Sequence, residues 1–337
     1  MQSQNKKLLA YLCALTLLFS YVEMILPRVV PFFRLGLANT VILLALDLDF
    51  SSFIILAILK ATAASLMGGT LFSPFFLISL VQSIVSALVM KFLYKLISKK
   101  ALSLYGISVA GSAVSAVIQI VLAGLYTGEG TFALLGPMLI FNTASGIVTA
   151  FFSEKFGMKE SICYLKNNPE SVSGLLQMSE SNEDRVLKTS QIILALVLIA
   201  ASVSIFFIKN LIALGCAFIV SLAAQKASKR KIYILPHLSL WLFVFISAVF
   251  VPNGKVLFSV WNISVTQGAL LIAARKALTL STVSALSQCA VNLKPGKKSL
   301  LGLSLEYYKI MSNRFRDADG SVIKKISYAL NLGVSGE

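Results

Sequence analysis

The stretch PFFRLGLANTVILLAL, residues 31–46, places one cation, Arg34, directly before a run of apolar residues. Such runs recur along the whole chain, many of them close to the roughly 20 residues that a helix needs to cross a bilayer. The 337 residues are 57% apolar and only 13% charged, whereas roughly 25% of the residues in soluble chains are charged. The sequence therefore predicts an all-α polytopic membrane protein.

The periodicity of the apolar runs predicts about ten transmembrane helices. The expected spans are residues 8–26, 37–48, 52–67, 73–94, 103–126, 132–152, 190–208, 210–225, 232–252 and 256–274. The first run follows Lys6 and Lys7, but no small-residue cleavage pattern ends it, so we expect a retained helix rather than a signal peptide. The charged, proline-containing stretch after the sixth span predicts a cytoplasmic linker at 156–189 between a membrane domain at 1–155 and a second at 190–337.

The basic residues predict the orientation of these helices. With both termini in the cytoplasm, the inner segments hold 25 of the 30 lysines and arginines, as expected for cytoplasmic loops. The sequence thus favours a multi-pass protein of a bacterial cytoplasmic (inner) membrane. Although the net charge is +16, the cations stand at the ends of apolar runs rather than along polar faces, and we therefore expect no nucleic-acid partner.

Motifs for catalysis and cofactor binding are missing from the sequence. PGKKS near Pro295 lacks the spacing of a phosphate-binding loop, so any use of ATP needs a partner protein. The sequence has no aspartate-rich DDxxD pair, no H-E-x-x-H motif and no CxxC spacing. We therefore predict no catalytic residues, no metal site and no cofactor, and interpret His237 as a residue at the membrane boundary.

Five polar residues near the predicted outer side are candidates for binding a solute: Glu23, Arg28, Arg34, Asn39 and Lys60. Ionisable groups within or beside membrane spans are energetically expensive, which makes each one a candidate site residue. Several cations with one carboxylate suit an acidic or zwitterionic small molecule. Alternatively, the long side chains reach the interface as anchors, and Glu23 pairs with one of the arginines.

Two polar residues deep in predicted spans, Gln119 and Asn142, are candidates for ligand binding or for hydrogen bonds between helices. Ala10 and Ala14 form an AxxxA step, a spacing that allows close approach of a second helix. GGT at 68–70 predicts either a flexible loop over a site or an ordinary turn.

Three segments resemble the Gx transporter family, which is also labelled heptaprenyl diphosphate synthase component I. They are RLGLANTVILLAL from Arg34, GGTLFSPFFLISL from Gly68 and YGISVAGSAVSAVIQIVLAG from Tyr105. The resemblance covers residues 5–155 and implies a six-helix, substrate-binding S component of an energy-coupling factor transporter. In such a protein the first helix contacts the transmembrane coupling subunit through small residues, which here implies Ala10 and Ala14. The usual polar residues of the fifth span are partly replaced at 112–117.

The segment PNGKVLFSVWNISVTQGALLIAARKALTLSTVSALSQ, Pro252 to Gln288, resembles the coupling, or T, component of the same transporters. That resemblance implies a four-helix membrane domain whose cytoplasmic tail docks on separate ATPase subunits. The family's tail carries Ala-Arg-Gly motifs. Here the tail is short, and the nearest match is NRFRDADG, with Arg314 and Arg316 but no Ala-Arg-Gly.

The leading hypothesis is a fused S-like and T-like membrane protein that imports a small vitamin-like or anionic solute and is not itself an enzyme. A second is a non-catalytic accessory subunit of heptaprenyl diphosphate synthesis, as the family's other label implies. A third is a membrane scaffold for a redox or flavin-modifying assembly.

Overall fold

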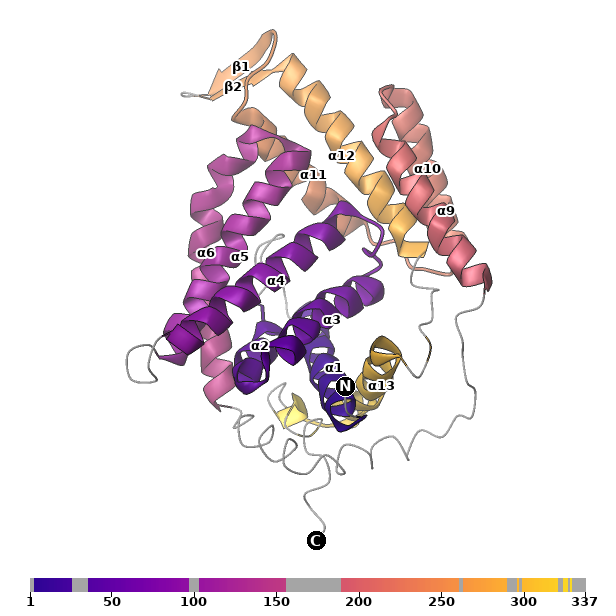
Figure 1. Cartoon of the computed structure of the whole chain (residues 1–337). Helices are drawn as coiled ribbons and strands as arrows, with labels where there is room; N and C mark the ends of the chain where they lie inside the picture. Colours follow the sequence, from indigo (N-terminus) through magenta and orange to yellow (C-terminus); the bar gives the residue numbers. More distant parts are fainter. Residues whose placement is uncertain are drawn as a thin grey trace.

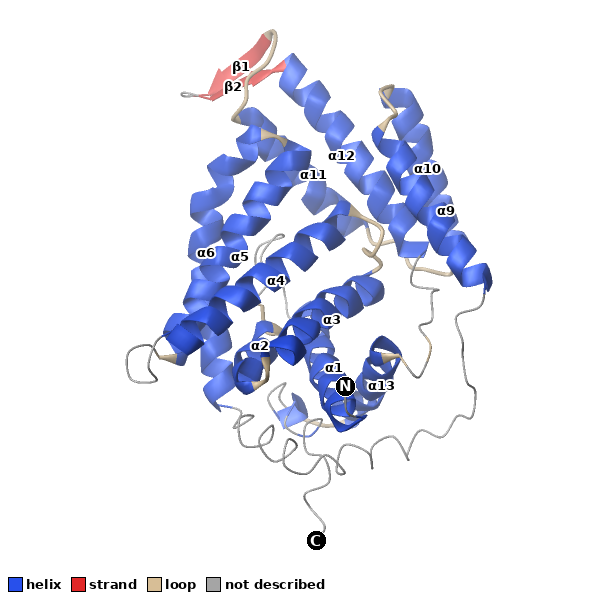
Figure 2. Cartoon of the chain, viewed as in Figure 1, coloured by secondary structure: helices blue, strands red, loops and turns tan. Residues whose placement is uncertain are grey.

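The computed structural model describes residues 3–25, 36–96, 103–155, 189–260, 263–289 and 299–320, together with isolated positions at 296, 324–326 and 328. Figure 2 shows that the described chain is helical apart from its loops and one small hairpin. The helices gather into two groups, drawn in indigo to magenta and in rose to orange in Figure 1.

Among the described residues, the N-terminal group contains six α-helices and two 3-10 helices. They are α1 (Ser3–Ile25), α2 (Asn39–Leu44), η1 (Ala45–Asp47), α3 (Phe50–Gly68), α4 (Pro74–Leu96), α5 (Leu104–Thr127), η2 (Glu129–Leu134) and α6 (Leu135–Lys155). Helix α5 packs against both α4 and α6, and α4 crosses the two diagonally (Figure 1).

The C-terminal group contains α9 (Thr189–Phe206), α10 (Leu211–Ala227), α11 (Ile234–Val249), β1 (Val256–Val260), β2 (Ile263–Thr266) and α12 (Gln267–Ser287). Helices α9, α10 and α11 each pack against α12, which therefore forms the centre of this group. The last long helix, α13 (Leu300–Asp317), leaves this group and packs against α1 (Figure 1).

Helix α1 forms the core of the N-terminal group. Every residue from Leu8 to Phe19 is buried, although a helix on a bundle surface would expose one face. Helices α2 and α3 cover part of its circumference and α13 covers another part. The tail that was expected to be short thus supplies an 18-residue helix that completes the burial of α1.

Five described helical segments are long and apolar enough to cross a membrane: Phe50–Gly68, Pro74–Leu96, Leu104–Thr127, Glu129–Glu154 and Gln267–Ser287. Shorter apolar helices lie at Ile192–Phe206, Leu211–Ala227 and Ile234–Val249. The chain is therefore a multi-pass, all-α membrane protein, and a count of ten spans stays a prediction.

The boundary predicted for the tenth span, 256–274, is wrong. Residues 256–260 and 263–266 form the antiparallel strands β1 and β2, and α12 begins only at Gln267. VLFSV and ISVT are rich in the β-branched and aromatic residues that favour strands. Because an apolar strand and an apolar helix follow each other with no charged residue between them, they resemble one continuous span. The shift places Arg275 and Lys276 inside α12 rather than in a cytoplasmic tail.

Candidate functional site

Asn39 and Lys60, two of the predicted solute-binding residues, are hydrogen-bonded to each other. The Lys60 ammonium in α3 donates to the side-chain oxygen of Asn39, the first residue of α2, and both residues are half-buried. Gly36 makes this possible, because its φ of 64° lies in the left-handed region that glycine adopts without strain. A hydrogen bond of 2.7 Å from the backbone amide of Asn39 to the carbonyl of Gly36 closes the turn.

Helix α6 approaches the same turn. A Cβ atom placed on Gly36 would lie 3.1 Å from the Ser145 hydroxyl oxygen and 3.3 Å from the Asn39 side-chain nitrogen. Asn142 precedes Ser145 by three residues and so lies on the same face of α6. It is half-buried and donates to the carbonyl of Met138 within its own helix at 2.9 Å. An amide, an ammonium and a hydroxyl therefore lie around the start of α2.

A second group of polar side chains lines one face of α5. Ser108, Ser112, Ser115 and Gln119 follow one another at helical spacing. Ser108 donates to the Gly146 carbonyl at 2.7 Å and lies 2.8 Å from the Thr149 hydroxyl. These bonds join α5 to α6, so Ser108 serves helix packing rather than ligand binding.

The polar face of α5 also contacts α4, where the side-chain amide of Gln82 donates to the hydroxyl of Ser115. Gln119 lies one helical turn further, is half-buried, and has no hydrogen bond to another described residue. Gln82 was not predicted as a site residue. The sequence could have indicated it, because Gln82 is the only asparagine or glutamine in the long apolar helix α4.

The remaining predicted solute-binding residues fall outside the described part of the chain. Arg28 and Arg34 belong to the undescribed segment 26–35, and Glu23 lies in α1 but its side chain is not described. The predicted cation cluster at the mouth of the site therefore stays a prediction.

A buried lysine, one of the 25 cations predicted to lie on the cytoplasmic side, explains why α2 is short. Lys91 of α4 is 5% exposed, and its ammonium donates to the carbonyl oxygens of Leu46 and Leu48, where the 3-10 turn after α2 ends. The ammonium also lies 5.1 Å from the centre of the Phe53 ring. A cation at a helix C-terminus satisfies its unpaired carbonyl groups and favours the end of the helix there.

Asp49 starts the next helix immediately after this break. Its carboxylate accepts a hydrogen bond from the Ser52 amide at 3.1 Å, which makes it the N-cap of α3. That hydrogen bond, with a smaller contribution from the charge of Lys91, lowers the pKa of the Asp49 carboxyl below its ordinary value.

The loop 69–73 and the end of α3 join the two groups of helices. The Gln288 side chain donates to the Gly68 carbonyl at 2.9 Å, and the Phe72 amide donates to the Ser287 hydroxyl at the same distance. Gly69, with φ at 69°, packs so closely on Gln288 that an added Cβ atom would overlap its side chain. This loop, predicted to be a flexible connector or a turn, is thus held against the end of α12.

A second junction involves the middle of α12 and the adjacent helix α11. The Lys276 ammonium donates to the Thr127 carbonyl at the end of α5 at 2.8 Å. Nearby, Gly130 of η2 packs on the backbone of Ser247 in α11, with no room for a Cβ atom. The Lys276 contact fixes α12, and the Gly130 contact fixes α11, relative to the N-terminal group.

The third junction is the packing of α13 on α1. The rings of Tyr11 and Tyr307 meet edge to face at 6.1 Å, and Tyr21 makes similar contacts with Tyr308 at 6.4 Å and Phe315 at 6.3 Å. Ser304 lies within hydrogen-bond reach of the Cys13 thiol.

Ala10 and Ala14 are fully buried. At about 100° per residue around α1, both fall on the arc between Tyr11 and Cys13 that also holds Tyr21, and each of these three contacts α13. The AxxxA step therefore faces the last helix of the same chain. Their contact with a separate coupling subunit stays a prediction.

Arg314 and Arg316, the predicted ATPase-coupling residues, lie in the last turn of α13. Arg314 is half-buried and Arg316 is exposed. Among the described residues, no three histidine, cysteine, aspartate or glutamate side chains group as metal ligands.

Two family models match different parts of the chain. Residues 12–156 match heptaprenyl diphosphate synthase component I, and residues 187–293 match a domain of unknown function, DUF8519. No curated protein and no solved structure matches the chain. The comparisons thus show that the N-terminal group of this membrane protein is similar to heptaprenyl diphosphate synthase component I.

Proposed function

We propose that this chain is a membrane subunit of an energy-coupling factor type transporter, in which residues 1–155 bind a small solute and residues 190–337 couple that half to separate ATPases. The proposal is supported by the absence of a phosphate loop, by the family match of the N-terminal half and by the polar groups around α2. An ammonium, a side-chain amide and a hydroxyl suit the carboxylate and polar substituents of an acidic or zwitterionic solute.

The contact at the loop 69–73 carries the transport part of the proposal. The charge distribution predicts that this loop faces outward, whereas the end of α12 and Arg230 are predicted to face the cytoplasm. Nevertheless, Gln288 donates to the Gly68 carbonyl, and Arg230 lies 3.4 Å from the Met67 carbonyl. The loop 69–73 is predicted on the outer side and its contact partners on the cytoplasmic side. These two predictions are compatible with the contact if the N-terminal half reorients against the C-terminal half during a transport cycle.

A disulfide across this contact tests reorientation. Phe72→Cys and Ser287→Cys, in a chain whose native cysteines are replaced, place thiols on two residues in direct contact, since the Phe72 backbone amide donates to the Ser287 hydroxyl at 2.9 Å. We expect oxidation to abolish solute uptake in vesicles and reduction to restore it. Each single-cysteine variant serves as the control. Uptake that continues at the same rate with the disulfide formed would contradict the proposal.

The solute is to be identified on the protein purified from its own host, by mass spectrometry of the bound small molecules. We expect Lys60→Met and Arg34→Ala to lower the retained solute at least tenfold, a loss that corresponds to about 1.4 kcal/mol. Lys95→Met, an exposed lysine at the end of α4, is the matched control. Full occupancy in both test variants would remove these residues from the site.

The ATPase part has its own test. If separate ATPases drive the cycle, two nucleotide-binding subunits should co-purify with the full-length chain, and Arg314→Ala with Arg316→Ala should weaken that association. Uptake that is unaffected by depletion of ATP would refute an ATP-driven cycle.

The name of the matched family favours a second function equally: a non-catalytic accessory subunit of heptaprenyl diphosphate synthesis, with the catalytic component as its partner. Deleting the gene separates the two functions. Loss of prenyl chain elongation with normal solute uptake would favour the accessory subunit, and the reverse result would favour the transporter.

A further inference from the structure

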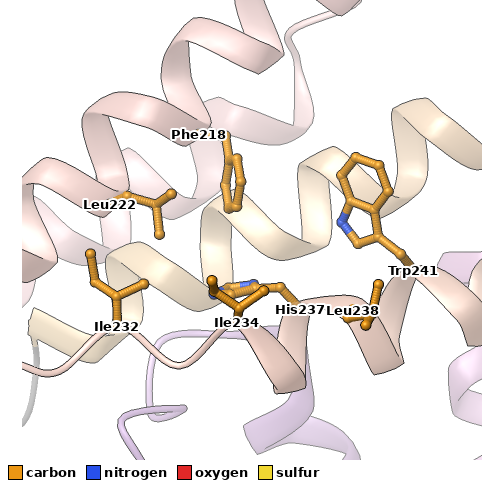
Figure 3. A pocket seen from close by; sticks show the side chains of 7 residues that line it. All are labelled: Phe218, Leu222, Ile232, Ile234, His237, Leu238 and Trp241. Carbon is orange, nitrogen blue, oxygen red and sulfur yellow. The ribbon is translucent and has the colours of Figure 1, made fainter.

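A cavity of about 230 Å³ lies between α10 and α11 in the C-terminal group (Figure 3). Its lining residues are Phe218, Leu222, Ile232, Ile234, His237, Leu238 and Trp241. The Phe218 and His237 rings meet edge to face at 5.4 Å, and Trp241 is held by a 2.9 Å hydrogen bond to Ser281 of α12. Both α10 and α11 pack on α12, so the floor of this apolar cavity is preformed.

The loop after α10 brings cations to the edge of the cavity. The Arg230 amide donates to the Gln225 carbonyl, and the Gln225 side chain donates back to the Lys231 carbonyl, both at 3.2 Å. These bonds fold the loop onto α10, and the residue after Lys231 is Ile232, which lines the cavity. Lys229 and Lys231 are both exposed.

Two residues carry polar atoms without hydrogen-bond partners among the described residues: His237, which lines the cavity, and Gln225, which is close to Leu222 in the sequence but does not line it. Gln225 is 3% exposed and lies one helical turn beyond Leu222, and its side-chain oxygen has no hydrogen-bond partner among the described residues. His237 is half-buried, and no hydrogen bond to another described residue is found for its ring nitrogens. A half-buried polar atom without a partner is costly, so a ligand that supplies a hydrogen bond to the His237 ring gains stability.

The charges of this part of the chain select an anionic ligand. Residues 189–305 contain no aspartate or glutamate. The same residues contain eleven cations: Lys209, Lys226, Lys229, Arg230, Lys231, Lys255, Arg275, Lys276, Lys294, Lys297 and Lys298. The lysines at the edge of the cavity therefore have no carboxylate partner within this part of the chain, and the loop that carries them is predicted to face the cytoplasm.

We propose that this cavity binds an anionic phospholipid of the cytoplasmic leaflet. One acyl chain lies between Phe218 and Leu238, and Lys229 and Lys231 hold the phosphate. A hydroxyl group of a glycerol headgroup hydrogen-bonds to the ring of His237. Anionic lipids are concentrated in the cytoplasmic leaflet, where each nearby lysine adds to their attraction. The proposal is independent of whether the chain is a transporter or an accessory subunit.

Trp241 provides a local probe of the cavity. The chain has two tryptophans, so Trp261→Phe leaves Trp241 as the only one. The full-length variant is placed in phosphatidylcholine vesicles that contain a small fraction of brominated phosphatidylglycerol or brominated phosphatidylcholine with matched chains. We expect brominated phosphatidylglycerol to quench Trp241 at the lower mole fraction, because its headgroup is recognised by the two lysines.

Two double variants test that recognition. Lys229→Gln with Lys231→Gln should reduce the preference for phosphatidylglycerol roughly thirtyfold, since each lysine near an anionic surface contributes about a five- to sixfold attraction. Lys209→Gln with Lys255→Gln, which removes two exposed cations from other loops, should leave the preference unchanged. Leu222→Phe, which fills part of the cavity, should weaken quenching by both lipids.

Thermal unfolding of each variant in detergent establishes that it is folded, and native mass spectrometry counts the lipids that the folded protein retains. Equal quenching by the two lipids in the parent, or a preference that survives in the Lys229 and Lys231 variant, would overturn the proposal. Displacement of phosphatidylglycerol by a lower concentration of farnesyl diphosphate would also overturn it and assign the cavity to a prenyl diphosphate.

Discussion

The ammonium of Lys276 donates a 2.8 Å hydrogen bond to the carbonyl oxygen of Thr127 and so joins the middle of α12 to the end of α5. Lysine is rare within a membrane span, and it is retained there where a specific partner satisfies it. The Thr127 carbonyl belongs to the last turn of α5, where backbone oxygens have no partner within their own helix. The bond therefore serves both helices and links the two halves of the protein.

Replacing Lys276 with methionine is expected to destabilise the protein by about 1.5 kcal/mol, the lower end of the range for a hydrogen bond from a charged group, because the lysine is only half-buried. The apparent melting temperature in detergent measures this loss. Lys255→Met, at an exposed position outside the helices, should leave it unchanged. Equal melting temperatures for Lys276→Met and the parent would show that the bond does not stabilise the junction.

Gly130→Ala tests the neighbouring contact between η2 and α11. The new methyl group would overlap the backbone carbonyl of Ser247, which cannot move without shifting α11. Overpacking of this kind costs about 1–3 kcal/mol, and hydrogen exchange of η2 should become faster. Gly136→Ala is the matched control, because nothing lies within 4 Å of the added atom. Similar behaviour of the two variants would argue against close packing at this junction.

Lys91→Met should destabilise the N-terminal half by roughly 1.5–3 kcal/mol, since two carbonyl groups in a buried environment lose a charged donor. Faster hydrogen exchange is expected first at α2 and η1, whose end Lys91 satisfies. The exposed Lys95, one turn further along α4, provides the control variant Lys95→Met. Unchanged exchange at 39–47 in Lys91→Met would refute the role assigned to this lysine.

Asp49 makes the stability of α3 depend on pH. The pKa of Asp49 is lower in the folded protein than the ordinary value of about 3.9. The Asp49 carboxylate therefore stabilises the folded protein fully at pH values above that ordinary pKa. This stabilisation is lost as the pH falls through the lowered folded-state pKa. We expect Asp49→Ala to cost about 1 kcal/mol at neutral pH and progressively less in acid. Asp49→Ser, which retains a capping oxygen without a charge, should remove the pH dependence, and unfolding titrations at several pH values measure it.

The membrane class and most helix positions could be predicted, because a run of about 20 apolar residues is typical of a membrane-spanning helix and of few other structures. The strands β1 and β2 could not be separated from α12, because these segments are apolar and no charge lies between them. The same continuity hid Lys276, which was assigned to the cytoplasm. Lys91 was hidden differently: its position near the end of a span is equally typical of an interfacial anchor, and only the fold brings the end of α2 beneath it.

The candidate site was predicted only in part for a related reason. Asn39 and Lys60 stand 21 residues apart, and their pairing depends on the left-handed turn at Gly36 and on the crossing of α2 and α3. Gln82 and Ser115 meet only because α4 crosses α5. Side-chain types in a sequence identify groups that need partners at depth, but the helix crossings decide which groups become partners.

The close packing of α13 on α1 leads to the last prediction. Ala14 is fully buried on the face of α1 that contacts α13, so Ala14→Leu would insert three carbon atoms between the helices and cost about 1–3 kcal/mol. Because α13 is more polar than the helices around it, separation of the two helices should relieve the overlap more easily than rearrangement of the core. Hydrogen exchange across 300–317 should therefore become faster while α5 and α6 stay protected. Ala223→Leu, at an exposed position of α10, should change neither region. Exchange that accelerates equally in α5 and α13 would instead mean that Ala14 supports the whole bundle and has no specific role in holding α13.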